Sequence, residues 1–203
     1  MKTKAIIGVA ILIFAIASCA KRNDINGTWT ATPVHIDNMQ YAADAFSVLS
    51  INFDAPKGAQ SGPVTVTMVI DATQPVDSGA TVGFAEPYEV SVTGTSTISG
   101  RWSYEDGEDD DILLFLDNNS LQINVDPDGV TFSRNLLTGA QQPMIDSLST
   151  VTAERWLTSM RSIAAKQFFE YSKLDDVMVS NDILSCKLGK RDLTFHRAPA
   201  PTL

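Results

Sequence analysis

The sequence predicts a mainly β protein, an antiparallel up-and-down β-barrel with one long α-helix before its last strands. Short runs in which apolar and polar residues alternate recur along most of the chain, and this alternation is typical of strands with one buried face. The pairs Asp106-Gly107, Asn118-Asn119 and Asp128-Gly129 stand between such runs and suit tight hairpin turns. A single late segment instead repeats its apolar residues at helical spacing.

The predicted strands begin at residues 27–34, where Trp29 and Ala31 alternate with threonines. In the second strand, residues 45–54, the apolar positions change parity after Val48, which is the signature of a β-bulge. Further alternating runs start at Val64, Val90 and Ile98 and cover residues 112–117, 120–125 and 129–134. Short antiparallel strands joined by tight turns indicate a barrel or a sandwich.

The helical segment runs from Pro143 to Tyr171, and Pro143 suits a first helical position. Its apolar residues form a stripe on one face: Ile145, Leu148, Trp156, Leu157, Met160, Ile163, Ala164 and Phe168. Because such stripes face a core, we expect a lid or an outer brace packed on the barrel. Strands return at residues 176–180, 183–188 and 192–197, so about ten strands in all predict a closed or nearly closed barrel.

The N-terminus has the layout of a signal peptide. Lys2 and Lys4 precede an apolar segment over residues 5–18, which is too short for a comfortable membrane span. Ile16-Ala17-Ser18-Cys19 resembles the lipobox of bacterial lipoproteins, and this resemblance implies cleavage before Cys19 and a diacylglyceryl group on its thiol. An ordinary secretory signal that is cut elsewhere is the alternative.

These features divide the chain into four parts. We expect a lipoprotein signal peptide at 1–18, a lipidated tether at 19–26, one barrel domain at 27–197 and a C-terminal tail at 198–203. With Cys19 acylated, Cys186 alone cannot form an intramolecular disulfide. Cys186 alternates in phase with Leu184 and Leu188, which predicts a small buried apolar side chain.

Gly27-Thr28-Trp29 resembles the Gly-x-Trp opening of the lipocalin and wider calycin group. In that group an Arg near the last strand packs over the Trp, and Arg197 matches this position because it shares parity with the apolar residues of its strand. A helix followed by a closing strand is also the order of the group. The resemblance therefore implies structural roles for Gly27, Trp29 and Arg197. The chain lacks the group's second signature, of Thr-Asp-Tyr type, and its helix is longer than usual.

A lipobox ahead of a Gly-x-Trp barrel resembles the small lipocalin-like lipoproteins of Bacteroidetes, which are mostly of unknown function. The resemblance implies a lipid anchor, palmitate included, in the outer membrane. Cys19 is followed by Ala-Lys-Arg rather than by a run of acidic residues. By analogy with the family, this favours the periplasmic face over export to the cell surface.

The composition and motifs exclude several function classes. With 24 acidic against 15 basic side chains, the formal net charge is −9, which argues against nucleic acid as a partner. The sequence contains no Gly-x-Ser-x-Gly elbow, phosphate loop, zinc-protease motif or dinucleotide fingerprint. His35 and His196 stand far apart in sequence, away from metal-ligand spacing. We therefore expect no enzyme, no cofactor and no metal site.

Two groups of residues remain as candidates for binding. Trp102 and Tyr104 point inward by parity and could line a ligand cavity, although such aromatics also fill small barrels. The acidic run from Glu105 to Asp111 offers oxygen ligands for calcium but lacks the spacing of an EF-hand loop. We expect this run to be a mobile, solvated hairpin tip.

The function expected first is that of a non-enzymatic, lipid-anchored binding module of the cell envelope, whose barrel holds an unknown small or extended ligand in its mouth or interior. One alternative is an accessory lipoprotein or inhibitor that docks a partner protein through the outer barrel surface. Another is a hydrolase whose site the sequence does not reveal. The interior volume separates the first two, since a cavity near Trp102 favours ligand binding and a solid core favours docking.

Overall fold

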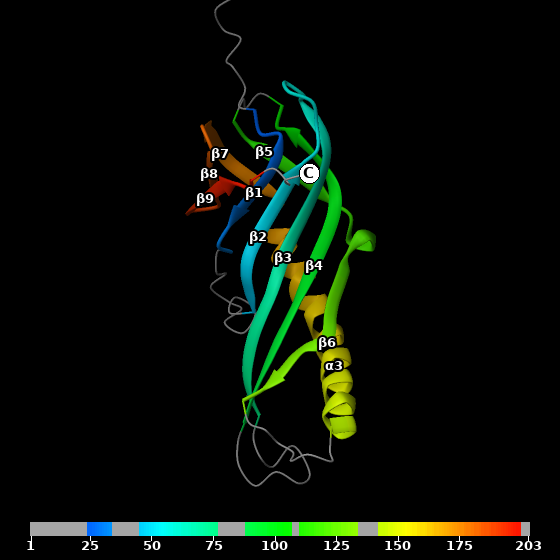
Figure 1. Ribbon diagram of the computed structural model, residues 1–203. Coiled ribbons are helices and arrows are strands. Elements are labelled where there is room, and N and C mark those ends of the chain that lie inside the picture. The colour runs from blue at the N-terminus through cyan, green and yellow to red at the C-terminus, as the bar shows by residue number, and fades with distance from the viewer. Residues whose placement is uncertain (1–23, 34–44, 77–87, 107–109, 134–141, 200–203) are drawn as a thin grey trace, which may run out of the picture.

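The computed structural model describes residues 24–33, 45–76, 88–106, 110–133 and 142–199 (Figure 1). In this part of the chain nine strands form one antiparallel sheet, accompanied by a single long helix. The strands are β1 (Gly27–Ala31), β2 (Phe46–Phe53), β3 (Ser61–Val76), β4 (Tyr88–Tyr104), β5 (Ile112–Leu116), β6 (Gln122–Phe132), β7 (Lys173–Ser180), β8 (Ile183–Leu188) and β9 (Arg191–Arg197). The helix is α3 (Gln142–Glu170), and a short 3-10 turn, η2 (Asn118–Ser120), joins β5 to β6.

Eight of these strands close a barrel, which confirms the predicted barrel, although the sequence predicts about ten strands. From β1 to β5 each strand pairs with the next one along the chain, and β5 then pairs with β7. β7 pairs with β8, β8 pairs with β9, and β9 returns to β1 and closes the ring. β6 stands outside this ring and pairs with β4 alone among the described strands. The barrel occupies one end of an elongated molecule, and β3 and β4 extend well beyond it (Figure 1).

Side-chain alternation explains the barrel core. The inward positions carry large apolar residues such as Ile51, Val66, Ile98 and Phe195, all of which are fully buried. The parity change in β2 is the predicted bulge, because the pairing with β3 shifts register between Phe46 and Val48. The extra residue leaves Val48 exposed and keeps Phe46 on the core face with Leu49, Ile51 and Phe53.

β4 spans 17 residues and takes part in both the barrel and its extension. Its last residues pair with β5, while Val90 to Thr97 pair with β6. Gly94 and Gly100 lie where neighbouring backbone comes closest: a Cβ atom would overlap the carbonyl oxygen of Asn124 at the first position and that of Phe115 at the second. Glycine at these positions lets the long strand pass tightly against its neighbours.

Two of the predicted hairpin turns are wrong. Asn118-Asn119 does not reverse the chain, because η2 leads from β5 into β6 and both strands pair with the same edge of β4. Ser120 bridges this interruption: its hydroxyl accepts from the Ser99 amide at 2.8 Å and donates to the Ser99 carbonyl at 3.0 Å. β5 and β6 are therefore successive segments along the same edge of β4.

Asp128-Gly129 is likewise no hairpin, because β6 continues through it to Phe132. The register with β4 shifts there: Val92 pairs with Val130, whereas Gly94 pairs with Val125. A long bulge in β6 thus replaces the predicted turn. Asp and Gly tolerate positive φ, and this property suits a bulge as well as a tight turn. The local sequence therefore does not distinguish the two.

The bounds of α3 agree with the predicted helix within one residue at each end. Ala153, Met160, Ala164 and Phe168 are buried along one side of it. The main neighbour of α3 is β6, so the helix lies along the extension (Figure 1). Its buried residues belong to the same apolar core as the inward residues of the barrel strands. β5 is too short to cover the whole of β4, and the remainder is covered by β6 and α3.

No helix in the described residues is long and apolar enough to cross a membrane. The predicted signal peptide and Cys19 lie outside the described residues.

Candidate functional site

The end of the barrel at which β1 begins is organised by Trp29 and Arg197. These residues face each other across the β1–β9 pair, and the guanidinium carbon lies 4.1 Å from the centre of the indole ring. Trp29 Nε1 donates to the carbonyl of Ile25 at 2.7 Å, and Arg197 Nη1 donates to that of Asn26 at 2.7 Å. The predicted contact between Trp29 and Arg197 is therefore present, and the chain before β1 is fastened to it.

Gly27 is the third residue of this arrangement. Its backbone has φ of +106°, a conformation that glycine adopts without strain. A Cβ atom at this position would also lie 3.1 Å from Arg197 Nη1. The glycine thus lets the chain turn into β1 directly beside the guanidinium group.

Trp102 and Tyr104, the predicted ligand-binding pair, lie inside a packed core. Trp102 is 2% exposed and makes edge-to-face contacts with Phe53 and Tyr104, with ring centres 5.7 and 5.6 Å apart. Gly62 pairs with Trp102 across β3 and β4, and a Cβ there would lie 3.1 Å from Trp102 Nε1. The indole fills the space that glycine leaves, and its buried N–H has no hydrogen-bond partner among the described residues.

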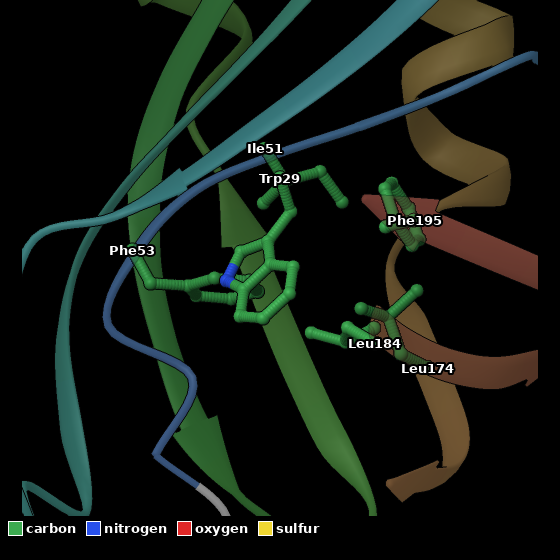
Figure 2. A pocket seen from close by; sticks show the side chains of 6 residues that line it. All are labelled: Trp29, Ile51, Phe53, Leu174, Leu184 and Phe195. Carbon is green, nitrogen blue, oxygen red and sulfur yellow. The ribbon is translucent and has the colours of Figure 1, made fainter. Parts of the chain in front are cut away.

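Figure 2 shows the gap between the two walls of the barrel, with the Trp29 indole lying between Phe53 and the aliphatic side chains of Leu174 and Leu184. Ile51 and Phe195 complete its lining, and the remaining space does not admit a water molecule. A core without space for a water molecule is typical of a close-packed protein interior.

The acidic loop after β4 is partly organised by a lysine that the sequence analysis did not single out. Lys173 Nζ lies 2.7 Å from Glu105 Oε2, 2.9 Å from Asp111 Oδ2 and 3.1 Å from Asp175 Oδ1. These contacts, to Glu105 first, raise the pKa of Lys173, and the hydrogen bond from Lys173 is the main cause that lowers the pKa of Asp111. We call these four residues the Lys173 clamp.

The expectation of a mobile, solvated tip is therefore wrong for Glu105 and Asp111. The amide of Glu105 also donates to the carbonyl of Asp111 at 3.0 Å, which closes the base of the loop. Residues 107–109 lie outside the described part of the chain, so the expectation is open for them. Among the described residues no group of His, Cys, Asp or Glu is arranged to hold a metal ion.

A groove with a volume of about 340 Å³ lies on the outer surface of β7, β8 and β9. Asp110, Asp176, Met178, Lys187 and Asp192 are among the residues that line it, and all five are exposed. We call it the β7–β9 groove. The sequence did not reveal this groove, although one signal was present. The apolar residues Leu174 and Val177 of β7, both buried, are three positions apart, and this spacing breaks the alternation of a regular strand and indicates a bulge.

The predictions about single reactive residues have different outcomes. Cys186 is buried, as the alternation predicts, and burial raises the pKa of its thiol to about 12, which disfavours the reactive thiolate. His196 is an exposed residue of β9 opposite Thr30. His35 lies outside the described residues, as does Cys19.

No match was found among known protein families, curated proteins or solved structures.

Proposed function

We propose that this protein is a lipid-anchored accessory protein of the cell envelope that docks a partner protein through its outer surface. The packed interior is the observation that carries this choice. A module that holds a ligand inside its barrel needs an apolar cavity, commonly of about 300 Å³ or more. The side chains around Trp29 and Trp102 instead fill the interior. What remains for recognition is the outer wall.

The proposed anchor is Cys19, in accordance with the lipobox resemblance. The fastening of Ile25 and Asn26 to Trp29 and Arg197 supports an anchored role, because it fixes the chain to the barrel directly after the tether. From Cys19 to Ile25 an extended chain reaches at most about 20 Å. In the proposed arrangement the end of the barrel where β1 begins therefore stays near the membrane, and the extension, along which α3 lies, points away from it.

The lipocalin-like lipoproteins remain the proposed family. Closure by eight strands, the helix before the last strands and the cation over the Trp29 ring support this assignment. The proposed location is the periplasmic face of the outer membrane, by analogy with the residues that follow the lipobox Cys.

The anchor is tested by metabolic labelling with a fatty-acid analogue. We expect the wild-type protein to carry label and to sediment with membranes, and Cys19→Ala to carry none and to be released. Cys186→Ala is the matched control and is expected to label like the wild type. Equal labelling of Cys19→Ala and the wild type would overturn the anchor.

The docking function is tested by native mass spectrometry of the full protein purified in mild detergent. We expect the mass of the polypeptide with its acyl groups and no further component. Cross-linking in cells should join the protein to one predominant partner protein. A small molecule that co-purifies in stoichiometric amount would favour the ligand-binding module and contradict the docking function.

A further inference from the structure

The β7–β9 groove exists because β7 separates from β8 at a bulge. Asp175 pairs with Lys187 and Met178 pairs with Ser185, so two β7 residues oppose the single residue Cys186 between them. This two-against-one arrangement interrupts the ladder and bends the strand. The groove lies over the interruption, on the outward face of the barrel.

The bulge is held open by the acidic loop. Asp176 has φ of 53°, a left-handed conformation that few residues other than glycine, asparagine and aspartate adopt. Its amide donates to Asp111 Oδ1 at 3.0 Å, and the amide of Val177 donates to the carbonyl of Asp110 at 2.7 Å. These amides therefore bond to the loop instead of to β8, and the groove is a built feature of the fold.

Charge on the groove is unbalanced. Asp110, Asp176 and Asp192 line it together with one cation, Lys187, which gives a formal balance of −2. Lys187 Nζ already lies 2.6 Å from Asp176 Oδ2, so these two charges offset each other. Lys187 also lies opposite Asp192 across β8 and β9, so one cation faces two carboxylates and the groove keeps its negative excess, with Asp110 and Asp192 both exposed.

An apolar surface accompanies these carboxylates. Met178 lines the groove and is 61% exposed, and Ile183 on β8 is 44% exposed. Met178 pairs with Ser185, so Ile183 is its diagonal neighbour on the outward face, close enough for both side chains to meet one ligand. Exposed methionine adapts its shape to varied partners. A ligand for this surface must be both cationic and apolar.

We propose that the β7–β9 groove is the site that docks a basic segment of the partner protein, with a Lys or Arg directed to Asp110 and Asp192 and an adjacent aliphatic side chain covering Met178. This proposal rests on the proposed docking function and names the chemistry of the partner. The volume of the groove suits a long side chain and its neighbour rather than a whole domain. Complementary charge also speeds association and selects against acidic competitors.

The first test uses a fluorescein-labelled peptide of alternating Lys and Leu and its Glu and Leu counterpart, titrated with the full protein in detergent. We expect saturable anisotropy with the Lys peptide and none with the Glu peptide. The double variant Asp110→Asn, Asp192→Asn should weaken binding about tenfold or more. The matched control Asp54→Asn, Asp71→Asn removes the same charge elsewhere and should leave the affinity within about twofold, since screening limits the reach of distant charges to about 10 Å.

The second test locates the peptide. A benzophenone group replaces the central Leu, and after irradiation we expect cross-linked fragments that contain Met178 or Ile183. Equal weakening by the two double variants, or cross-links confined to other surfaces, would overturn the groove as the docking site. These outcomes leave the labelling of Cys19 and the cross-linked partner in cells unaffected, so failure of the groove is distinct from failure of the docking function.

Discussion

At the scale of the residue, the contact between Trp29 and Arg197 shows how one pair fixes the start of the barrel. The guanidinium covers the indole at 4.1 Å and holds the carbonyl of Asn26, while the indole holds that of Ile25. Arg197 is still partly exposed, with its Nε 3.5 Å from Asp182 Oδ1. Its contribution therefore comes mainly from the ring and the carbonyl, because an exposed ion pair adds little.

The first prediction concerns Arg197→Ala. Loss of the cation over the ring, worth about 0.5 to 2 kcal/mol, and of one charged hydrogen bond should lower the free energy of unfolding by about 1 to 3 kcal/mol. Urea unfolding followed by Trp fluorescence measures this change, and the circular dichroism spectrum should stay the same. Arg101→Ala, at an exposed position of β4, is the control. Equal stability of the two variants would contradict the structural role of Arg197.

At the scale of the element, the Lys173 clamp joins three strands. Glu105 follows β4, Asp111 precedes β5, and Lys173 and Asp175 belong to β7. β5 and β7 share only a short pairing, at Ile112–Leu174 and Leu113–Lys173. The clamp therefore reinforces the place where the barrel closes after the long excursion through β6 and α3.

The second prediction concerns pH. Lys173 lowers the pKa of Asp111 from its ordinary value of 3.8. A carboxyl group with a lowered pKa in the folded state stabilises the fold above its ordinary pKa and loses this effect as pH falls through the folded value. Lys173→Met should therefore melt at a lower temperature than the wild type near neutral pH, and the difference should shrink below about pH 4.

Thermal melting between pH 2.5 and 7 measures this difference, using Lys166→Met as the control because Lys166 is an exposed residue of α3. High salt should also reduce the effect, since the clamp is partly exposed. A difference in melting temperature that stays constant down to the lowest pH would show that the clamp does not act through Asp111.

At the scale of the whole molecule, apolar aromatic side chains are packed inside the barrel and a groove lies open on its outer wall. Phe53, Trp102 and Tyr104 interlock inside, whereas Phe115, Met178 and Ile183 are exposed outside. The interior thus provides stability, and the outer wall is the surface on which the proposed docking would take place.

The third prediction concerns Trp102→Ala. Removal of this buried ring should lower the free energy of unfolding by about 3 to 5 kcal/mol and leave an apolar cavity. Such cavities bind benzene or xenon, so benzene should raise the melting temperature of the variant and leave the wild type unchanged. Phe115→Ala, at an exposed position, should change stability by less than about 0.5 kcal/mol. An equal response of the wild-type protein to benzene would mean that its interior is not filled.

The sequence by itself determined the parts of the fold that depend on local pattern. Alternation predicted the strands and the bulge near Val48, helical spacing predicted α3 within one residue, and parity placed Trp29 and Arg197 on the same face. Each of these features follows from the direction in which neighbouring side chains point, which backbone geometry fixes over a few residues.

Only the tertiary structure decided how those elements pair. Whether Asn118-Asn119 turns the chain back or leads it onward along β4 depends on strands far away in sequence. The same holds for the clamp at Lys173, for the groove at Asp176 and for the filled interior around Trp102. The interior volume depends on the tilt of all eight barrel strands and on the total volume of the side chains that point inward. No local period in the sequence encodes that total.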